Sequence, residues 1–68
     1  MELSARNQLK GTIKSVDIGD IMAEVVIDIG GQEITSSITR KSAQRLDLKV
    51  GQKVVAIIKA TEVIIGKE

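Results

Sequence analysis

The side chains best suited to chemistry in this chain are hydrogen-bond donors, and they gather in three short segments. Ser4-Ala5-Arg6-Asn7-Gln8 concentrates donors ahead of the first predicted strand. Thr39 and Ser42 place hydroxyls at the start of a predicted short helix, where backbone amides lack an intrahelical partner. Lys59 interrupts an apolar stretch near the carboxyl end. A tetrahedral oxyanion is mainly an acceptor, so donors and positive charge of this kind are what it requires.

Each of these three signals also has a plainer interpretation. A polar opening segment is typical of a frayed terminus. Thr39 and Ser42 are suited to capping the helix. A lysine at the end of a buried strand commonly extends its amine to water. Taken one at a time, the three segments therefore favour structural roles over anion binding.

The composition leaves little room for catalysis or metal binding. The 68 residues include no His and no Cys, so the usual general bases, thiol nucleophiles, zinc ligands and disulfides are absent. Gly30-Gly31 leads into a predicted strand rather than a helix, which gives no support to a nucleotide-binding loop. Four carboxylates crudely resemble a cation site but fall in a predicted hairpin, where solvated charges are expected: Asp17, Asp20, Glu24 and Asp28. The sequence indicates a binding protein, not an enzyme.

Charge is unevenly distributed along the chain although its net value is only +1. Residues 17–33 carry five acids and no base, whereas residues 34–61 carry six bases and one acid. This division fits two solvated faces, or complementary faces between subunits. It also fits a basic half that collects an anion.

Length and hydrophobicity predict a single domain, residues 1–68, that associates with copies of itself. A domain of this size buries only about 60% of the surface that its unfolded chain exposes. Hydrophobic residues make up 43% of the chain, yet no Phe, Tyr, Trp, Cys or Pro is present. Oligomerisation is the remaining way to stabilise so small a fold. Neither a signal-peptide pattern nor an apolar run near the ~18 residues of a membrane span is seen, so we expect a cytoplasmic protein without a membrane partner.

Alternating hydrophobicity predicts three successive strands in the first half of the chain. In residues 21–29, Ile21, Ala23, Val25, Ile27 and Ile29 share one face, which is typical of a half-buried strand. A hairpin at Gly30-Gly31 leads to residues 32–39, with Ile34 and Ile38 inward. An earlier strand at residues 8–16 places Leu9 and Ile13 inward.

A short helix and two apolar strands are predicted in the second half. Residues 40–46 break the alternation, with Thr39 as the N-cap and Ala43 and Leu46 packed inward. Residues 54–58 and 63–65 are apolar throughout, so each strand needs cover on both faces, which a second subunit can supply. The order predicts an all-β fold, a five-stranded OB-like Greek-key barrel with one short helix between strands three and four.

Taken together, three segments of this chain closely resemble the molbindin (Mop) family. They are Ser4-Ala5-Arg6-Asn7-Gln8-Leu9-Lys10-Gly11, Ile34-Thr35-Ser36-Ser37-Ile38-Thr39 and Ile57-Ile58-Lys59-Ala60-Thr61-Glu62-Val63. The resemblance covers essentially the whole chain. A similar module occurs in molybdate-responsive transcription regulators and in molybdate transport ATPases.

The resemblance implies an OB-like barrel that assembles as a homohexamer, a trimer of dimers, and holds molybdate or tungstate between subunits without an organic cofactor. Matching motif positions imply that Ser4, Arg6 and Lys59 come from one subunit, assisted by amides near Ala5. Thr39 and Ser42 come from its neighbour. Members of that family also bind further anions near the three-fold axis of the assembly.

Three functions follow as alternatives. Storage or buffering of molybdate needs only reversible binding, which suits a small stand-alone domain. A structural or interaction module would keep the oligomer without an anion site. Nucleic-acid binding, common among OB folds, is disfavoured because no aromatic side chain is available for base stacking. The sequence does not decide between molybdate and tungstate, or how sulfate would be rejected.

Overall fold

Alternating aliphatic and polar residues build an antiparallel meander of three strands, β1 (Asn7–Ile18), β2 (Met22–Asp28) and β3 (Glu33–Thr39). The computed structural model describes all residues, 1–68. Ala23, Val25 and Ile27 of β2 are buried on one face. The register sets them opposite Ile38, Ser36 and Ile34 of β3 respectively, so the predicted inward face of these two strands is confirmed.

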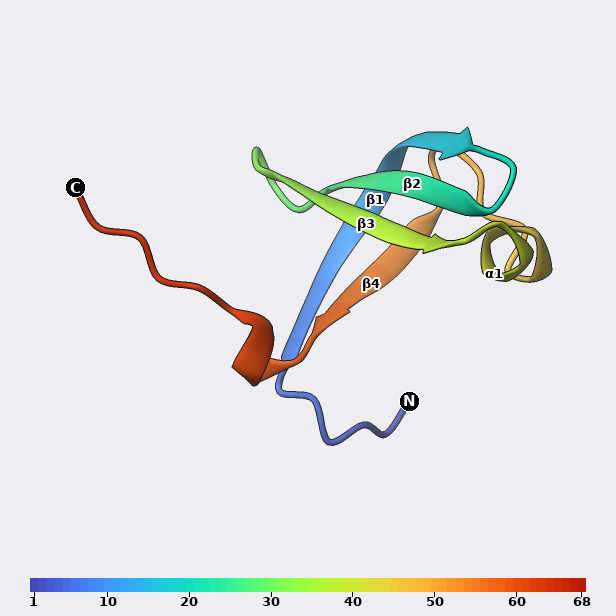
Figure 1. Cartoon of the computed structure of the whole chain (residues 1–68). Coiled ribbons are helices and arrows are strands. Elements are labelled where there is room, and N and C mark those ends of the chain that lie inside the picture. Colours follow the sequence, from blue (N-terminus) through green and yellow to red (C-terminus); the bar gives the residue numbers. More distant parts are fainter.

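The fourth strand, β4 (Lys53–Ile58), returns across the molecule to pair with β1, which gives the strand order β3-β2-β1-β4. This is the spatial order of a Greek key. The helix α1 (Arg40–Arg45) lies between β3 and β4 in the chain, as predicted, and closes one end of the sheet (Figure 1). A single 3-10 turn, η1 (Ala60–Glu62), follows β4. No helix is long enough to span a membrane.

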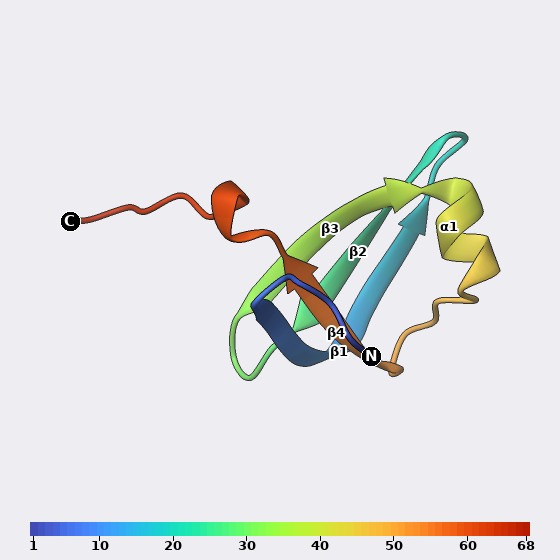
Figure 2. The ribbon, with the colours of Figure 1, turned by 90° about the horizontal axis from the view of Figure 1, so that it is seen from below.

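The sheet curls around a small aliphatic core centred on Ile13, which is only 1% exposed. Val25, Ile27 and Ala56 complete the buried cluster. A bulge between Ile13 and Ser15 breaks the β1–β2 register and bends β1, so that its first half pairs with β4 and its second half with β2 alone. The bend turns the flat ladder into the curved sheet of Figure 2.

Gly11 makes this curvature sterically feasible where β1 passes the end of β2. A Cβ at this position would lie 2.5 Å from Cγ2 of Ile27 and 2.6 Å from the carbonyl oxygen of Asp28. Both distances are shorter than van der Waals contact, and one of the two neighbours is backbone. The position therefore accepts only glycine without movement of the sheet.

Replacing Gly11 with Ala is expected to lower the free energy of unfolding by about 1–3 kcal/mol, the usual range for overpacking. Scanning calorimetry should show a fall of roughly 4–8 °C in Tm for each kcal/mol. Gly66→Ala is the matched control, because a Cβ there meets nothing within 4 Å. If both variants melt like the parent, the close approach of β1 to β2 is wrong.

The hairpin between β2 and β3 is held by Asp28. Its Oδ1 accepts hydrogen bonds from the backbone N–H groups of Gly30 at 2.9 Å and Gly31 at 3.1 Å. Both glycines have positive φ, at 97° and 93°, which other residues rarely adopt. The two hydrogen bonds, that from Gly31 first, lower the pKa of Asp28 below its usual value.

Asp28 is therefore expected to make stability depend on pH. A carboxyl whose pKa is lower in the folded than in the unfolded chain stabilises the fold above the unfolded value, about 3.9, and this stabilisation is lost as pH falls through the folded pKa. Asp28→Asn should have a lower Tm than the parent at pH 7, and the gap should close in acid. Asp17→Asn, which removes an exposed charge from β1, is the control. A gap that is constant with pH would exclude this role.

The predicted fifth strand is wrong for the single chain, which forms four strands rather than five. Residues 63–65 follow η1, which directs them away from the sheet, so they pair with no strand (Figure 1). Three predicted inward residues are also exposed, and Leu9 of β1 is one of them, at 37%. Ile21 is 77% exposed because the second strand begins only at Met22, and Leu46 is 58% exposed because the helix ends at Arg45.

Candidate functional site

Arg6 and Lys59 lie at the same end of the β1–β4 ladder. The last paired residues at this end are Asn7 and Ile58, and Arg6 and Lys59 are their immediate neighbours along each strand. In an antiparallel pair, these two positions lie opposite one another. Two cations that are 53 positions apart in the sequence are thus brought to one place by the return of β4.

Both cations remain available for a ligand. The two ion pairs of the chain join Lys14 to Glu33 and Lys49 to Asp47, neither of which uses Arg6 or Lys59. Arg6 and Lys59 are exposed. Neither side chain donates a hydrogen bond within the chain, whereas those of Arg40 and Lys53 do. Uncompensated positive charge of this kind attracts an anion from solution.

The segment that carries Ser4, Ala5 and Arg6 is shaped by Gln8. Nε2 of Gln8 donates to the carbonyl oxygen of Ala5 at 2.8 Å. This bond engages the Ala5 carbonyl and leaves the side chains of Ser4 and Arg6 exposed to solvent. In the sequence, Gln8 is one of the donors of the opening segment, but the motif assigns it no role at the site. Its spacing of three residues from Ala5, which allows a local side-chain to backbone bond, was the available signal.

Thr39 and Ser42 lie together at the junction of β3 and α1. Oγ1 of Thr39 accepts the backbone N–H of Ser42 at 3.1 Å, so the predicted N-cap is confirmed. The same hydroxyl donates to Oγ of Ser42 at 2.9 Å. With its own oxygen receiving that bond, the Ser42 hydroxyl is left to donate outward. Thr39 thereby orients and polarises the Ser42 donor.

The structure does not bring the two groups of predicted residues together within one chain. Ser4, Ala5, Arg6 and Lys59 lie at the Asn7 end of β1, whereas Thr39 is paired with Met22, beside the Ile18 end. The 12 residues of β1 would span roughly 36 Å if straight. Figures 1 and 2 show the amino-terminal segment and α1 at well-separated places. Hydrogen bonds to an oxyanion are about 2.7–2.9 Å long, so these two groups of residues within one chain cannot contact the same oxyanion.

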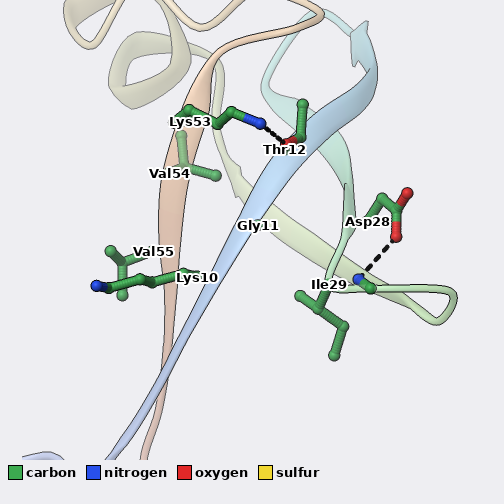
Figure 3. Close-up of a pocket in the computed structure, with 9 residues that line it drawn as sticks. Lys10, Gly11, Thr12, Asp28, Ile29, Lys53, Val54 and Val55 are labelled. Atoms are coloured by element: carbon green, nitrogen blue, oxygen red, sulfur yellow. Dashed lines mark hydrogen bonds between the residues drawn. The ribbon is translucent and has the colours of Figure 1, made fainter.

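A hollow of about 630 Å³ beside β1 and β4 is a separate feature (Figure 3). None of the six predicted site residues lines it. Its polar groups are largely engaged with each other: Nζ of Lys53 donates to Oγ1 of Thr12 at 2.8 Å, and Asp28 binds the glycine amides. The side chain of Lys10 extends away from the Lys53–Thr12 hydrogen bond rather than toward it (Figure 3). The hollow therefore lacks the convergent donors of an oxyanion site.

Comparison with known proteins adds an independent finding. The sequence profile of the TOBE domain family matches residues 3–65. The chain is 48% identical over 69 residues to a probable molybdenum-pterin-binding protein of Haemophilus influenzae, with all of both chains covered. That relative is named as a binding protein rather than as an enzyme.

Two solved structures share this fold. A molybdate-binding protein from Sporomusa ovata superimposes with a TM-score of 0.94 at 43% identity, covering 98% of this chain and all of the other. ModG, described as a cytoplasmic molybdate-binding protein and solved with molybdate bound, matches with a TM-score of 0.88 at 45% identity. The match covers 94% of this chain and 46% of that one.

Proposed function

We propose that this chain, which belongs to the TOBE domain family and within it to the molbindin (Mop) group, binds molybdate or tungstate reversibly in sites formed between copies of itself. The observation that carries the proposal is the position of Arg6 and Lys59, each directly next to the last register pair of the β1–β4 ladder, Asn7 with Ile58. Two cations without carboxylate partners at one strand end fit a dianion better than they fit a structural role.

The donor set matches the chemistry of a tetrahedral oxyanion. Arg6 offers a planar fork of N–H groups and Lys59 a compact ammonium, which together offset the charge of a dianion. Ser4 adds a hydroxyl, and the backbone around Ala5 adds amides. Ser42 donates from a second copy, with Thr39 holding it in place. No group in this set needs an organic cofactor.

The distance between the two proposed half-sites in one chain supports a function that requires several copies of the chain to assemble. Because one chain holds Arg6 and Lys59 far from Ser42, a complete site requires two copies in contact. A homohexamer arranged as a trimer of dimers satisfies this requirement, with residues 1–68 as the single domain of each subunit. The exposed aliphatic side chains on a domain with only six buried residues favour such an assembly.

Storage or buffering in the cytoplasm is the role that such a protein would fill. Reversible binding at an exposed inter-subunit site needs no chemistry and no second domain. One structural relative is described as a cytoplasmic molybdate-binding protein, which supports the same location. A nucleic-acid role finds less support, because the chain offers no aromatic side chain on which bases could stack.

Scanning calorimetry with molybdate, tungstate, sulfate or phosphate tests the proposal, alongside the mass from light scattering. A ligand at 100 times its Kd stabilises the folded state by about 2.7 kcal/mol. Molybdate and tungstate should raise Tm while sulfate and phosphate do not, in a particle of about 44 kDa for six chains of 7.3 kDa. A hexamer whose Tm is indifferent to all four anions would be a structural module, and the binding proposal would fail.

A further inference from the structure

The helix α1 carries three cations and no carboxylate. They are Arg40, Lys41 and Arg45, and the first turn contains no acidic residue. The positive end of a helix dipole lies at the N-terminus, so acidic side chains are favoured in the first turn and cations are disfavoured there. Arg45 lies in the last turn, where the dipole favours a cation. Arg40 and Lys41 are thus placed where the helix itself disfavours positive charge.

Contacts within the chain account for Arg40 but not for Lys41. Arg40 is half-buried, and its Nη1 donates to the carbonyl oxygen of Gly19 at 3.3 Å. Lys41 is exposed, and its ammonium takes part in no ion pair and donates no hydrogen bond within the chain. Arg45 lies four residues further on, and like charges at this spacing on a helix repel. Nothing within the chain therefore balances the charge of Lys41.

Lys41 directly precedes Ser42, the outward donor of the proposed half-site at the start of α1. Oγ of Ser42 accepts from Thr39, which leaves its own proton for a ligand. Adjacent Cα atoms are about 3.8 Å apart, so the Lys41 ammonium stays within roughly 13 Å of the Ser42 hydroxyl in every rotamer. In Figure 2, α1 lies at the edge of the molecule. An anion bound by Ser42 would therefore lie in the electric field of an unbalanced lysine.

We infer that Lys41 makes the proposed site select tetrahedral oxyanions by charge, favouring a dianion over a monoanion of the same shape. This inference rests on the proposed function. Arg6 and Lys59 would offset the charge of the anion by direct contact, whereas Lys41 adds an attraction at a distance that grows with the charge of the anion. Perrhenate is the informative competitor, because it is tetrahedral and close to molybdate and tungstate in size but carries a single negative charge.

Coulomb's law sets the expected size of the effect. In water at low ionic strength, a unit charge about 10 Å from the anion changes the Kd of a dianion about fourfold and that of a monoanion about twofold. Salt at about 1 M shortens the screening length to about 3 Å and removes most of this attraction. Dependence on anion charge and on salt thus distinguishes Lys41 from a residue that only supports the fold.

Isothermal titration calorimetry of Lys41→Gln and Lys41→Glu with molybdate and with perrhenate tests the inference, in about 0.01 M and about 1 M potassium chloride. At low salt, Lys41→Gln should raise the Kd of molybdate about fourfold and that of perrhenate about twofold. Reversal of the charge in Lys41→Glu should raise them about 16-fold and about fourfold. In the high-salt buffer, both variants should bind molybdate within about twofold of the parent.

Lys49→Gln and Lys49→Glu are the matched controls. They change the net charge by the same amounts, but the Lys49 ammonium already lies 3.5 Å from Oδ2 of Asp47, which offsets its charge. Both variants should bind molybdate and perrhenate with the parent's Kd. Light scattering verifies that every variant keeps the parent's mass.

The outcomes separate this inference from the proposed function. A parent that binds no oxyanion would refute the proposed function, and the inference with it. If the parent binds molybdate and the Lys41 variants keep its Kd at low salt, the inference alone is refuted. Equal losses for molybdate and perrhenate, or losses that persist at high salt, also overturn it, because a purely structural effect depends on neither anion charge nor salt.

Discussion

Replacing Arg6 or Lys59 with Ala is expected to weaken molybdate binding by roughly 10- to 150-fold, which corresponds to the loss of about 1.5–3 kcal/mol for a charge-assisted hydrogen bond. The two side chains lie next to the last register pair of the β1–β4 ladder, outside the buried core. Assembly and Tm without ligand should therefore change little. Isothermal titration calorimetry measures the affinity, and light scattering verifies the assembly.

Lys10→Ala is the matched control for charge removal. Lys10 is exposed on β1, four residues after Arg6, and is paired with Val55, three register pairs from the end of the ladder. This variant should bind molybdate with the parent's Kd. If Arg6→Ala and Lys59→Ala also retain that Kd, the two cations do not form the site, whatever the protein binds elsewhere.

The regular part of the fold could be predicted from the sequence because its signals are local. Alternation in β2 and β3, the Gly30-Gly31 turn and the Thr39 cap each depend on neighbours within a few residues, and each is confirmed within one or two positions. The exposure of Ile21 depends on where the β1–β2 turn ends, since the Gly19 N–H bonds to the carbonyl of Met22 at 2.8 Å. The hydrophobic periodicity of the sequence does not specify this hydrogen bond, which closes the β1–β2 turn.

The fifth strand could not be placed for a different reason. Residues 63–65 have the composition of a strand, but a strand exists only when a neighbour accepts its hydrogen bonds. Within the single chain, η1 turns the segment away from the two edges that could accept it. Composition therefore predicts that this segment is suited to a strand. Which strand it pairs with depends on the assembly of several chains, and composition does not contain that information.

The candidate site shows the same division between local and non-local information. The helix cap at Thr39 and Ser42 is local, whereas the placement of Arg6 and Lys59 at the same end of the β1–β4 ladder requires the return of β4 along β1. Residue types alone could not show that Thr39 uses its hydroxyl on Ser42 and so positions a donor. The resemblance to molbindins implied all six residues and their division between two subunits, and within one chain the two groups lie at opposite ends of β1.

Mixing two impaired variants is expected to restore part of the binding, because the proposed site joins residues of two different copies. Lys59→Ala impairs one half-site and Ser42→Ala impairs the other, so neither assembly alone should bind molybdate well. After unfolding and refolding together in equal amounts, about a quarter of the sites should join two intact half-sites by random association of copies. Equilibrium dialysis with molybdenum analysis counts these restored high-affinity sites.

The stoichiometry of the mixture distinguishes a site between copies from a site within one chain. If each chain formed its own site, every chain in the mixture would still carry one defect, and no high-affinity binding would return. A mixture of Lys59→Ala with Arg6→Ala is the matched control, because both changes fall in the same half-site and should not complement. No restored binding in the Ser42 mixture would place the site within a single chain. Restored binding in the control would show that Arg6 and Lys59 of one site come from different copies. Either result would contradict the proposed division into half-sites.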